Sequence, residues 1–391
     1  MVDANLRLSR LVTAIRGEPL PCAFVDLDAF DENVGRLLAP IVAAKKTLRP
    51  ATKSVRVPEL LRRVSAQPGV RGLMTYSPRE TLYLAEQGFS DLLCAYPTLQ
   101  SSDTDALASA AKHTVVRVVC DDVAHIAALD AAGERMGTTL GVVVEIDMSY
   151  RPLERIHLGV RRSPLRTAAD AAAFAERVAS FAHVRFDGVM GYEAHIAGVG
   201  DRRSPGKRAM KLAARRALER TRADIHRLLP TISVFNGGGT GSVHWAAREP
   251  ALTEITAGSG FLDSHLFDHY MDVPLVPAAF FALQAVRRPT KNIVTCAAGG
   301  YIASGGAGAD RLPIPVFPEG ARLLPLEGAG EVQTPVELPR GTHIALGEAV
   351  LFRHAKAGEL AEHFNEYVLI RRQQIESRAR TYRGLGYCFL G

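Results

Sequence analysis

The chain has 391 residues, enough for two domains, and its 47% hydrophobic and 23% charged residues are typical of a folded globular protein. The formal net charge of +6 suits anionic ligands, but no basic and aromatic motif accompanies it, so we expect no nucleic-acid partner. No long uncharged apolar run and no apolar N-terminal signal segment are present, so we predict a cytoplasmic protein without a membrane partner.

The N-terminal part begins with polar and apolar residues at helical spacing. We predict a short helix within residues 1–20 and an extended apolar segment over 22–27. Asp28 is expected to cap the helix that follows. Ser77, followed by a proline and then by a glutamate three positions later, has the pattern of another helix start.

Extended apolar segments alternate with helical patterns from residue 46 to about residue 257. Eight such strand–helix units predict a closed (β/α)8 TIM barrel. The alternative is a doubly wound open sheet, but no Gly-x-Gly-x-x-Gly motif follows the first strand. The expected strands are 47–51, 71–75, 91–95, 115–119, 141–147, 185–190, 232–236 and 253–257, and the expected helices include 101–112, 121–135, 167–182 and 204–228.

The pattern changes after about residue 270, where prolines cluster and helical periodicity disappears. Short extended segments and turns at 292–296, 299–302, 313–317, 347–353 and 367–370 predict a C-terminal all-β domain. We therefore predict a barrel domain over 22–272, and a β domain formed by 1–21 and 273–391.

Lys53 directly follows the first barrel strand. Active sites of (β/α)8 barrels lie at the carboxyl ends of the strands, so Lys53 is expected at the site. Burial of a lysine lowers its pKa and frees the amine to form a Schiff base with a carbonyl group. Pyridoxal 5'-phosphate (PLP) is the cofactor that most often uses such a lysine. A solvated loop lysine is the alternative.

Glycine-rich loops follow the seventh and eighth predicted strands, at 237–241 and 258–260. Loops at these two places commonly form the phosphate site of a barrel. Because the first strand of a closed barrel neighbours the eighth, Lys53 is expected to face this phosphate site, an arrangement that favours PLP. The expected phosphate ligands are Gly238, Gly239, Thr240, Gly258 and Ser259.

Polar residues also follow the fifth and sixth predicted strands. Tyr192 is expected to contact the cofactor, and His195 to contact it or to transfer protons near pH 7. A structural, hydrogen-bonded role is the alternative for His195. At the end of the fifth strand, a carboxylate of Glu145 or Asp147 is expected to orient other groups or to pair with Arg151.

A further polar motif, 354–359, follows the predicted strand 347–353. His354, Glu359 and His363 suggest a divalent metal site, with His354 as its main candidate ligand. Lys356 argues against tight coordination because metal ligands must be deprotonated. The alternative is a structural or substrate-binding role.

Together these motifs resemble the PLP-dependent fold-type III enzymes of the D-threonine aldolase and D-serine dehydratase family, which is alanine racemase-like. Within this family, the chain is most similar to bacterial amino acid deaminase/aldolase proteins. The resemblance implies PLP on Lys53, a C-terminal β domain and a homodimer whose sites lie near the partner's β domain. It is carried by residues 48–53, 188–192, 237–241, 253–258, 353–359 and 381–389.

Two positions depart from the family. In the dehydratases and aldolases of this family, a cysteine or aspartate lies two residues after the histidine equivalent to His354. These two side chains hold a metal. Here Lys356 stands at the second position and can supply positive charge itself. Racemase-like members carry an arginine where this chain has His157.

We therefore predict a PLP-dependent lyase that acts on β-hydroxy amino acids of D configuration, by aldol cleavage or by dehydration with deamination. The candidate catalytic residues are Lys53, His195, His354 and Lys356. An amino acid racemase and a non-catalytic PLP carrier or regulator are the alternatives, and the long C-terminal part favours an enzyme.

Overall fold

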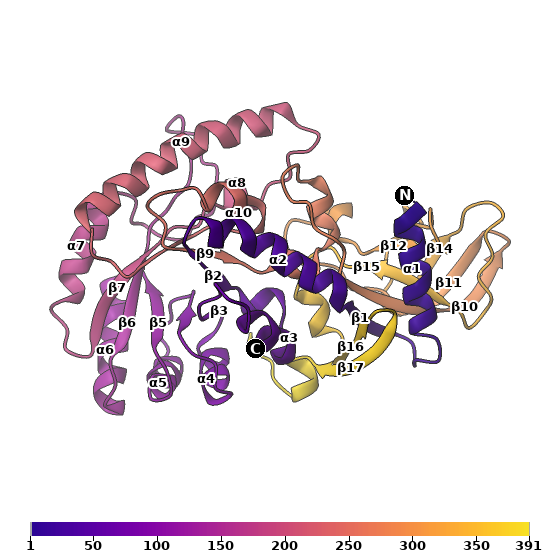
Figure 1. Ribbon diagram of the computed structural model, residues 1–391, viewed down its shortest axis with the longest axis horizontal. Helices are drawn as coiled ribbons and strands as arrows, with labels where there is room; N and C mark the ends of the chain where they lie inside the picture. Colours follow the sequence, from indigo (N-terminus) through magenta and orange to yellow (C-terminus); the bar gives the residue numbers. More distant parts are fainter. Residues whose placement is uncertain (1, 391) are drawn as a thin grey trace.

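A near-closed barrel of eight parallel strands forms the larger part of the chain in the computed structural model, which describes residues 2–390 (Figure 1). The strand order is β2-β9-β8-β7-β6-β5-β4-β3, and single bridges from Leu48 to Val70 and from Ala51 to Met74 bring β2 beside β3. The barrel prediction is thereby confirmed over the open sheet. The strands are β2 (Thr47–Pro50), β3 (Leu73–Thr75), β4 (Leu92–Cys94), β5 (Val116–Cys120), β6 (Leu140–Glu145), β7 (Val184–Met190), β8 (Val234–Gly237) and β9 (Glu254–Ala257).

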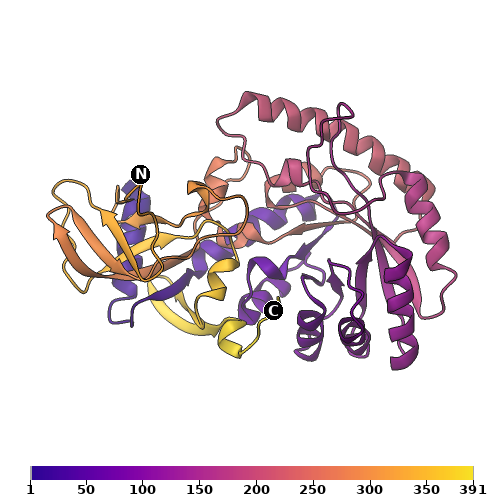
Figure 2. The same cartoon turned by 180° about the vertical axis from the view of Figure 1, so that it is seen from behind.

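The longer helices surround the barrel strands on the outside, as Figures 1 and 2 show from opposite sides, and short helices lie in the loops after β7, β8 and β9. They are α2 (Leu27–Ala43), α3 (Pro58–Ser65), α4 (Pro78–Glu86), α5 (Ser101–Ala110), α6 (Val123–Met136), α7 (Ala168–Val178), α8 (Ala194–Ala197), α9 (Pro205–Leu228), α10 (Val243–Ala246) and α11 (Ser259–Leu262). Ser77 caps α4 as predicted, because its side chain accepts a hydrogen bond from the Glu80 N–H. The cap of α2 is Asp26 rather than Asp28, since the chain passes from strand to helix without a loop.

A second, nine-stranded sheet packs beside the barrel and combines β1, from the N-terminal part of the sequence, with strands that all follow the barrel in the sequence. Its strands are β1 (Cys22–Asp26), β10 (Ala279–Thr290), β11 (Ile293–Ala297), β12 (Ile314–Phe317), β13 (Arg322–Leu323), β14 (Gln333–Glu337), β15 (Ala349–Arg353), β16 (Glu366–Arg371) and β17 (Gln374–Arg380). Helix α1 (Val2–Ala14) packs against this sheet through Leu11. The strand predicted at 299–302 is wrong, because this segment is a loop that begins after Ala298, a residue with a φ of 66°.

Strand β1 belongs to the second sheet, although the predicted barrel domain began at residue 22. It pairs with β10 in the antiparallel sense and with β16 in the parallel sense, so residues far apart in the sequence determine its place. The predicted domain division stays a prediction. We propose one change to it, in which the first boundary lies after β1.

A buried ion-pair network holds the first barrel strand in register. Arg49 is fully buried, and its guanidinium donates to Glu254 at 2.7 Å and to Asp91 at 3.0 Å. Removing one partner of such a pair typically costs about 3–5 kcal/mol because the other charge stays buried. Arg49 therefore joins β2 to β9 and to the start of β4, and it fixes the strand that carries Lys53 at its end. No helix within residues 2–390 has the length and apolarity to cross a membrane.

Candidate active site

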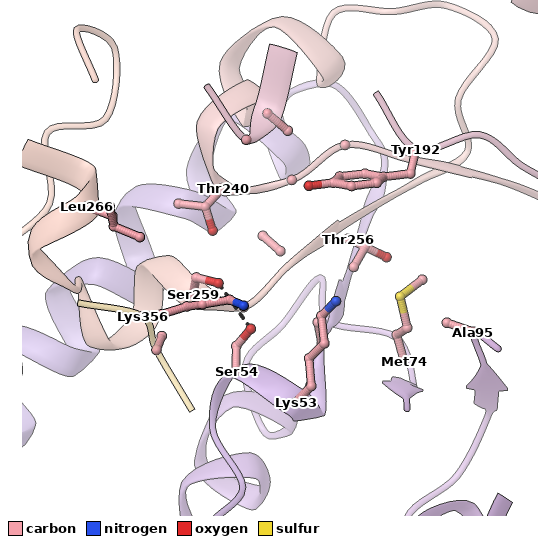
Figure 3. Close-up of a pocket in the computed structure, with 18 of the residues that line it drawn as sticks. Lys53, Ser54, Met74, Ala95, Tyr192, Thr240, Thr256, Ser259, Leu266 and Lys356 are labelled. Carbon is pink, nitrogen blue, oxygen red and sulfur yellow. Dashed lines mark hydrogen bonds between the residues drawn. The ribbon is translucent and has the colours of Figure 1, made fainter. Parts of the chain in front are cut away.

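A cavity of about 340 Å³ lies where the carboxyl ends of the barrel strands meet the second sheet (Figure 3). Its walls come from the loops after β2, β7, β8 and β9 and from two segments of the β domain, around residues 304–311 and 356–357. Most of the predicted site residues line this cavity, namely Lys53, Tyr192, Gly238, Gly239, Thr240, Gly258, Ser259 and Lys356. The structure thus brings together the lysine and both glycine-rich loops.

The Lys53 side chain extends into the cavity from a short 3-10 helix, Thr52–Ser54, at the end of β2. Its Nζ donates a hydrogen bond to the Tyr96 hydroxyl at 2.9 Å. The backbone carbonyl of Lys53 accepts from Arg56 at 3.0 Å. The side chain is exposed, although a partly buried lysine was expected, because the cavity is open at this point. The amine is therefore accessible to a carbonyl compound that enters the cavity.

The β domain closes around the Lys53 segment. Glu80, which is fully buried, accepts hydrogen bonds from the Tyr382 hydroxyl at 2.7 Å and from Thr52 at 2.9 Å. Burial raises the pKa of Glu80 to about 7. Gly358 touches the same segment, since a Cβ at this position would overlap the Lys53 carbonyl oxygen. The C-terminal part of the chain therefore helps to place the lysine.

The two glycine-rich loops lie side by side at one end of the cavity. A Cβ at Gly258 would stand 2.7 Å from the Ala51 carbonyl oxygen, so glycine allows the loop after β9 to approach the loop after β2. Ser259 and Ser54 are joined by a hydrogen bond of 3.1 Å between their hydroxyls. Thr240 accepts from the Gly260 N–H at 3.0 Å, which links the loop after β8 to that after β9.

A buried carboxylate holds the loop after β8 from behind. Glu193 accepts hydrogen bonds from the Gly238 N–H at 3.1 Å and from the Ser242 hydroxyl at 2.8 Å, and it pairs with Arg222 at 2.7 Å. The Gly238 N–H is therefore engaged by Glu193, although Gly238 itself lines the cavity as predicted. Arg222 and Glu193 are both fully buried, although Arg222 belongs to a run of basic residues on helix α9.

A residue that the sequence analysis missed, Arg162, also lines the cavity. Its guanidinium carbon lies 5.4 Å from the Tyr192 ring centre and 5.9 Å from that of Tyr96, distances at which a cation is attracted to an aromatic face. Burial raises the pKa of Tyr192 to about 12, so its hydroxyl stays protonated at neutral pH. His157, at the position where the resemblance suggests an arginine, lies outside the cavity wall and within 3.2 Å of the Val160 carbonyl oxygen.

His195 lies behind the cavity wall and is almost fully buried. Neither ring nitrogen has a hydrogen-bond partner within residues 2–390. The alternative, a structural histidine held by hydrogen bonds, is therefore not seen either. Burial lowers the pKa of His195, which keeps the ring neutral. Its predicted role in proton transfer stays a prediction, without a direct path to the cavity in this conformation. The pairing predicted for Asp147 and Arg151 is confirmed at 2.6 Å.

His354 is also buried and does not line the main cavity. Burial, together with the neighbouring Arg353 charge, lowers the pKa of His354 to about 3. Lys356, two residues later, does reach the cavity, and its Nζ lies 3.0 Å from Glu359. Figure 3 shows the amino groups of Lys53 and Lys356 pointing into the cavity from different segments.

The charges on the cavity wall are of one sign. Lys53, Arg162, Arg311 and Lys356 line it, and no carboxylate within residues 2–390 does so. PLP fits these surroundings, because Lys53 is placed to bind its aldehyde carbon and the hydroxyls of Ser54, Thr240 and Ser259 gather at one end for its phosphate. The remaining cations are available for a second anionic group, such as a carboxylate.

Known proteins share both the sequence family and the fold. The family described as alanine racemase, N-terminal domain, matches residues 25–261. A 3-hydroxy-D-aspartate aldolase from Paracoccus denitrificans is 28% identical over 246 residues, which are 62% of this chain and 60% of that protein, less than two thirds of its length.

Two solved structures resemble the chain over nearly its whole length. D-threonine aldolase from Filomicrobium marinum has a TM-score of 0.81 at 21% identity and covers 94% of this chain and 96% of its own. D-threo-3-hydroxyaspartate dehydratase from Delftia sp. HT23 has a TM-score of 0.72 at 18% identity and covers 95% of this chain and 98% of its own. These likenesses confirm the alanine racemase-like fold.

Proposed function

We propose, from the premise that this chain belongs to the alanine racemase N-terminal domain family, that it is a PLP-dependent lyase acting on β-hydroxy D-amino acids. The reaction is aldol cleavage, or dehydration followed by deamination. The observation that carries the proposal is the Lys53 amine in a cavity with two glycine-rich loops and with no carboxylate on its wall among the described residues. Similarity to aldolases of a D-amino acid and to a dehydratase supports the substrate class.

Different residues of the chain would hold the cofactor and act on the substrate. Lys53 would hold the aldehyde carbon of PLP, and the loops at Thr240 and Ser259 would hold its phosphate. When bound, PLP supplies an electron-withdrawing ring that stabilises negative charge at the α-carbon of the substrate. The Lys53 amine then accepts a substrate proton, and the Tyr96 hydroxyl at 2.9 Å orients that amine.

The cations on the wall orient the substrate. Arg162 stands beside Tyr192 and Tyr96, on the side of the cavity where Lys53 ends, so it is placed to bind the substrate carboxylate. Arg311 and Lys356 come from the β domain and face the same cavity. A substrate with a second carboxylate, such as 3-hydroxyaspartate, would meet a cation at each end. We therefore propose a preference for acidic β-hydroxy amino acids.

The two alternatives are less well supported. A racemase needs a base on each face of the substrate, and the cavity offers Lys53 and the protonated Tyr192 rather than an obvious second base. A non-catalytic PLP carrier has no need of a second domain over its barrel mouth, whereas residues 304–311 and 356–357 contribute to this cavity. We also propose a homodimer, which the family resemblance implies; light scattering at assay concentration tests it.

The test is a product screen with the purified protein and added PLP. D and L forms of 3-hydroxyaspartate, threonine and serine are supplied, and glycine, aldehyde, 2-oxo acid and ammonia are measured. Aldol cleavage gives glycine and an aldehyde, whereas dehydration gives a 2-oxo acid and ammonia. The proposal predicts one of these product pairs from a D substrate. Interconversion of D and L forms without either pair would favour the racemase instead.

A further inference from the structure

The segment 354–359 disagrees with the metal site that the resemblance implies. A family metal would need His354 and a cysteine or aspartate at position 356, where this chain has a lysine. Among residues 2–390, no group of three or more His, Cys, Asp and Glu side chains is arranged to hold a metal ion. Imidazole, thiolate and carboxylate are good ligands, whereas an ammonium group has no lone pair to donate and repels a cation. The donor set therefore does not fit the ion.

The other candidate ligands near His354 are engaged elsewhere. Glu359 accepts hydrogen bonds from the Ser304 N–H at 2.7 Å and from the Ser304 hydroxyl at 2.5 Å, in addition to pairing with Lys356. The His363 ring lies against the Tyr301 ring, with centres 4.7 Å apart. The nitrogens of His354 are free of hydrogen bonds within residues 2–390, but a single imidazole does not make a tight divalent site.

The Lys356 ammonium is fixed rather than freely mobile. Its Nζ donates to the Ser304 hydroxyl at 2.5 Å and lies 3.0 Å from Glu359, so two partners in the β domain hold it in place. The chain reaches this point because Gly358, with a φ of 82°, packs directly on the Lys53 backbone. The side chain keeps 45% of its surface exposed and lines the cavity. A positive charge is thereby held at the cavity that also receives Lys53.

We propose that the Lys356 ammonium takes the place of the divalent ion and directs a fixed positive charge at the β-oxygen of the substrate, so that this protein works without a metal. The inference rests on the proposed lyase function. In dehydration the Cβ–O bond breaks, its electron pair goes to oxygen, and a proton from Lys356 completes the departing water. In aldol cleavage the β-hydroxyl proton passes to the Lys53 amine, the Cα–Cβ bond breaks with its electron pair left at the α-carbon, and the Lys356 ammonium donates a hydrogen bond to the oxygen that becomes a carbonyl. Solvent then reprotonates the amine where a proton was given.

The experiment measures bound metal and activity on the same preparations of PLP-loaded protein. Elemental analysis follows dialysis against chelator and then against excess Zn²⁺ or Mn²⁺, with removal of unbound ion. Wild type, Lys356→Met and Lys356→Cys are compared, and Lys291→Met, an exposed lysine of the β domain, is the control. The PLP absorbance shows whether each variant still holds cofactor.

The wild type is expected to retain well under about one ion per chain and to keep its activity in chelator. Lys356→Met should lose about 100-fold in kcat, the typical effect of removing one stabilising donor, with cofactor retained. Lys356→Cys should gain an ion through the new thiolate beside His354, and a second change, His354→Ala, should abolish that gain.

Two results would overturn the inference. One is a wild type that carries about one ion per chain and loses it together with its activity in chelator. The other is a Lys356→Met variant as active as Lys291→Met. If no β-hydroxy amino acid is turned over by any preparation, the proposed function fails, whereas the metal content still decides whether the wild type holds an ion.

Discussion

Arg222 offers the sharpest test of how the cavity is built. Replacing Arg222 with methionine leaves Glu193 fully buried without its counter-charge. Glu193 keeps its hydrogen bonds from Gly238 and Ser242, but the loss of a buried partner typically costs about 3–5 kcal/mol. Two guanidinium nitrogens of Arg222, Nε and Nη1, are buried without a partner within residues 2–390, which reduces the net contribution of the arginine. We therefore expect a loss of about 3 kcal/mol, the low end of that range.

The assay is urea unfolding combined with PLP titration. Arg222→Met should lower the unfolding midpoint and also weaken PLP binding, because Glu193 fixes the loop that carries Gly238. Arg220→Met, an exposed arginine on the same helix α9, is the control and should change neither quantity. Adding Glu193→Gln should recover part of the lost stability by removing the unpaired charge. An Arg222→Met loss below about 1 kcal/mol, or one equal to that of Arg220→Met, would refute the reasoning.

Three further outcomes follow from the cavity. Gly258→Leu or Gly239→Leu should weaken PLP affinity in titration, since each added side chain meets a neighbouring loop; unchanged affinity in both would count against the phosphate end assigned here. Arg162→Met should raise KM for a D-hydroxy amino acid with PLP binding retained, and an unchanged KM would remove Arg162 from the substrate site. For Glu80, burial raises the folded pKa to about 7, so the folded state binds the extra proton and wild-type stability should fall as pH rises from about 4.5 to about 7. Glu80→Gln should flatten that part of the stability curve, and an unaltered curve would contradict the assignment.

The strands and the lysine could be predicted from the sequence because their signals are local. Buried parallel strands are short apolar runs, and the residue that follows such a run lies at the mouth of a barrel. Lys53 and the loop at 258–260 were found in this way. Glycine also marks a tight approach of backbones, which is what Gly258 allows.

The missed features depend on contacts between distant parts of the chain. Strand β1 looks like any apolar strand, but its partners β10 and β16 lie more than 200 residues away. Arg222 occurs in a run of basic residues, yet it falls on the same helix face as the buried Leu218 and Ile225. The helical spacing of these three residues was a sign that Arg222 is buried, but the basic composition of the run concealed it. Arg162 had no such signal, because its loop carries several arginines and only the fold shows which one faces the cavity.

Sequence reasoning also assigned roles to two histidines that the fold places behind the cavity wall. His195 and His354 follow strands β7 and β15, where a side chain can point either to the cavity or into the packing behind it. Both side chains are buried, so in this structure they lie in the packing behind the cavity. A one-residue difference in loop register changes which side chain enters the cavity, and Lys356 rather than His354 does so here.

The most direct test of the account is where the cofactor attaches. The protein is incubated with PLP, treated with borohydride, digested and mapped by mass spectrometry, beside a Lys53→Ala variant. The account predicts a reduced pyridoxyl group on Lys53 and a loss of both the attached group and the lyase activity in Lys53→Ala. Attachment to any other lysine, or full activity in Lys53→Ala, would contradict it.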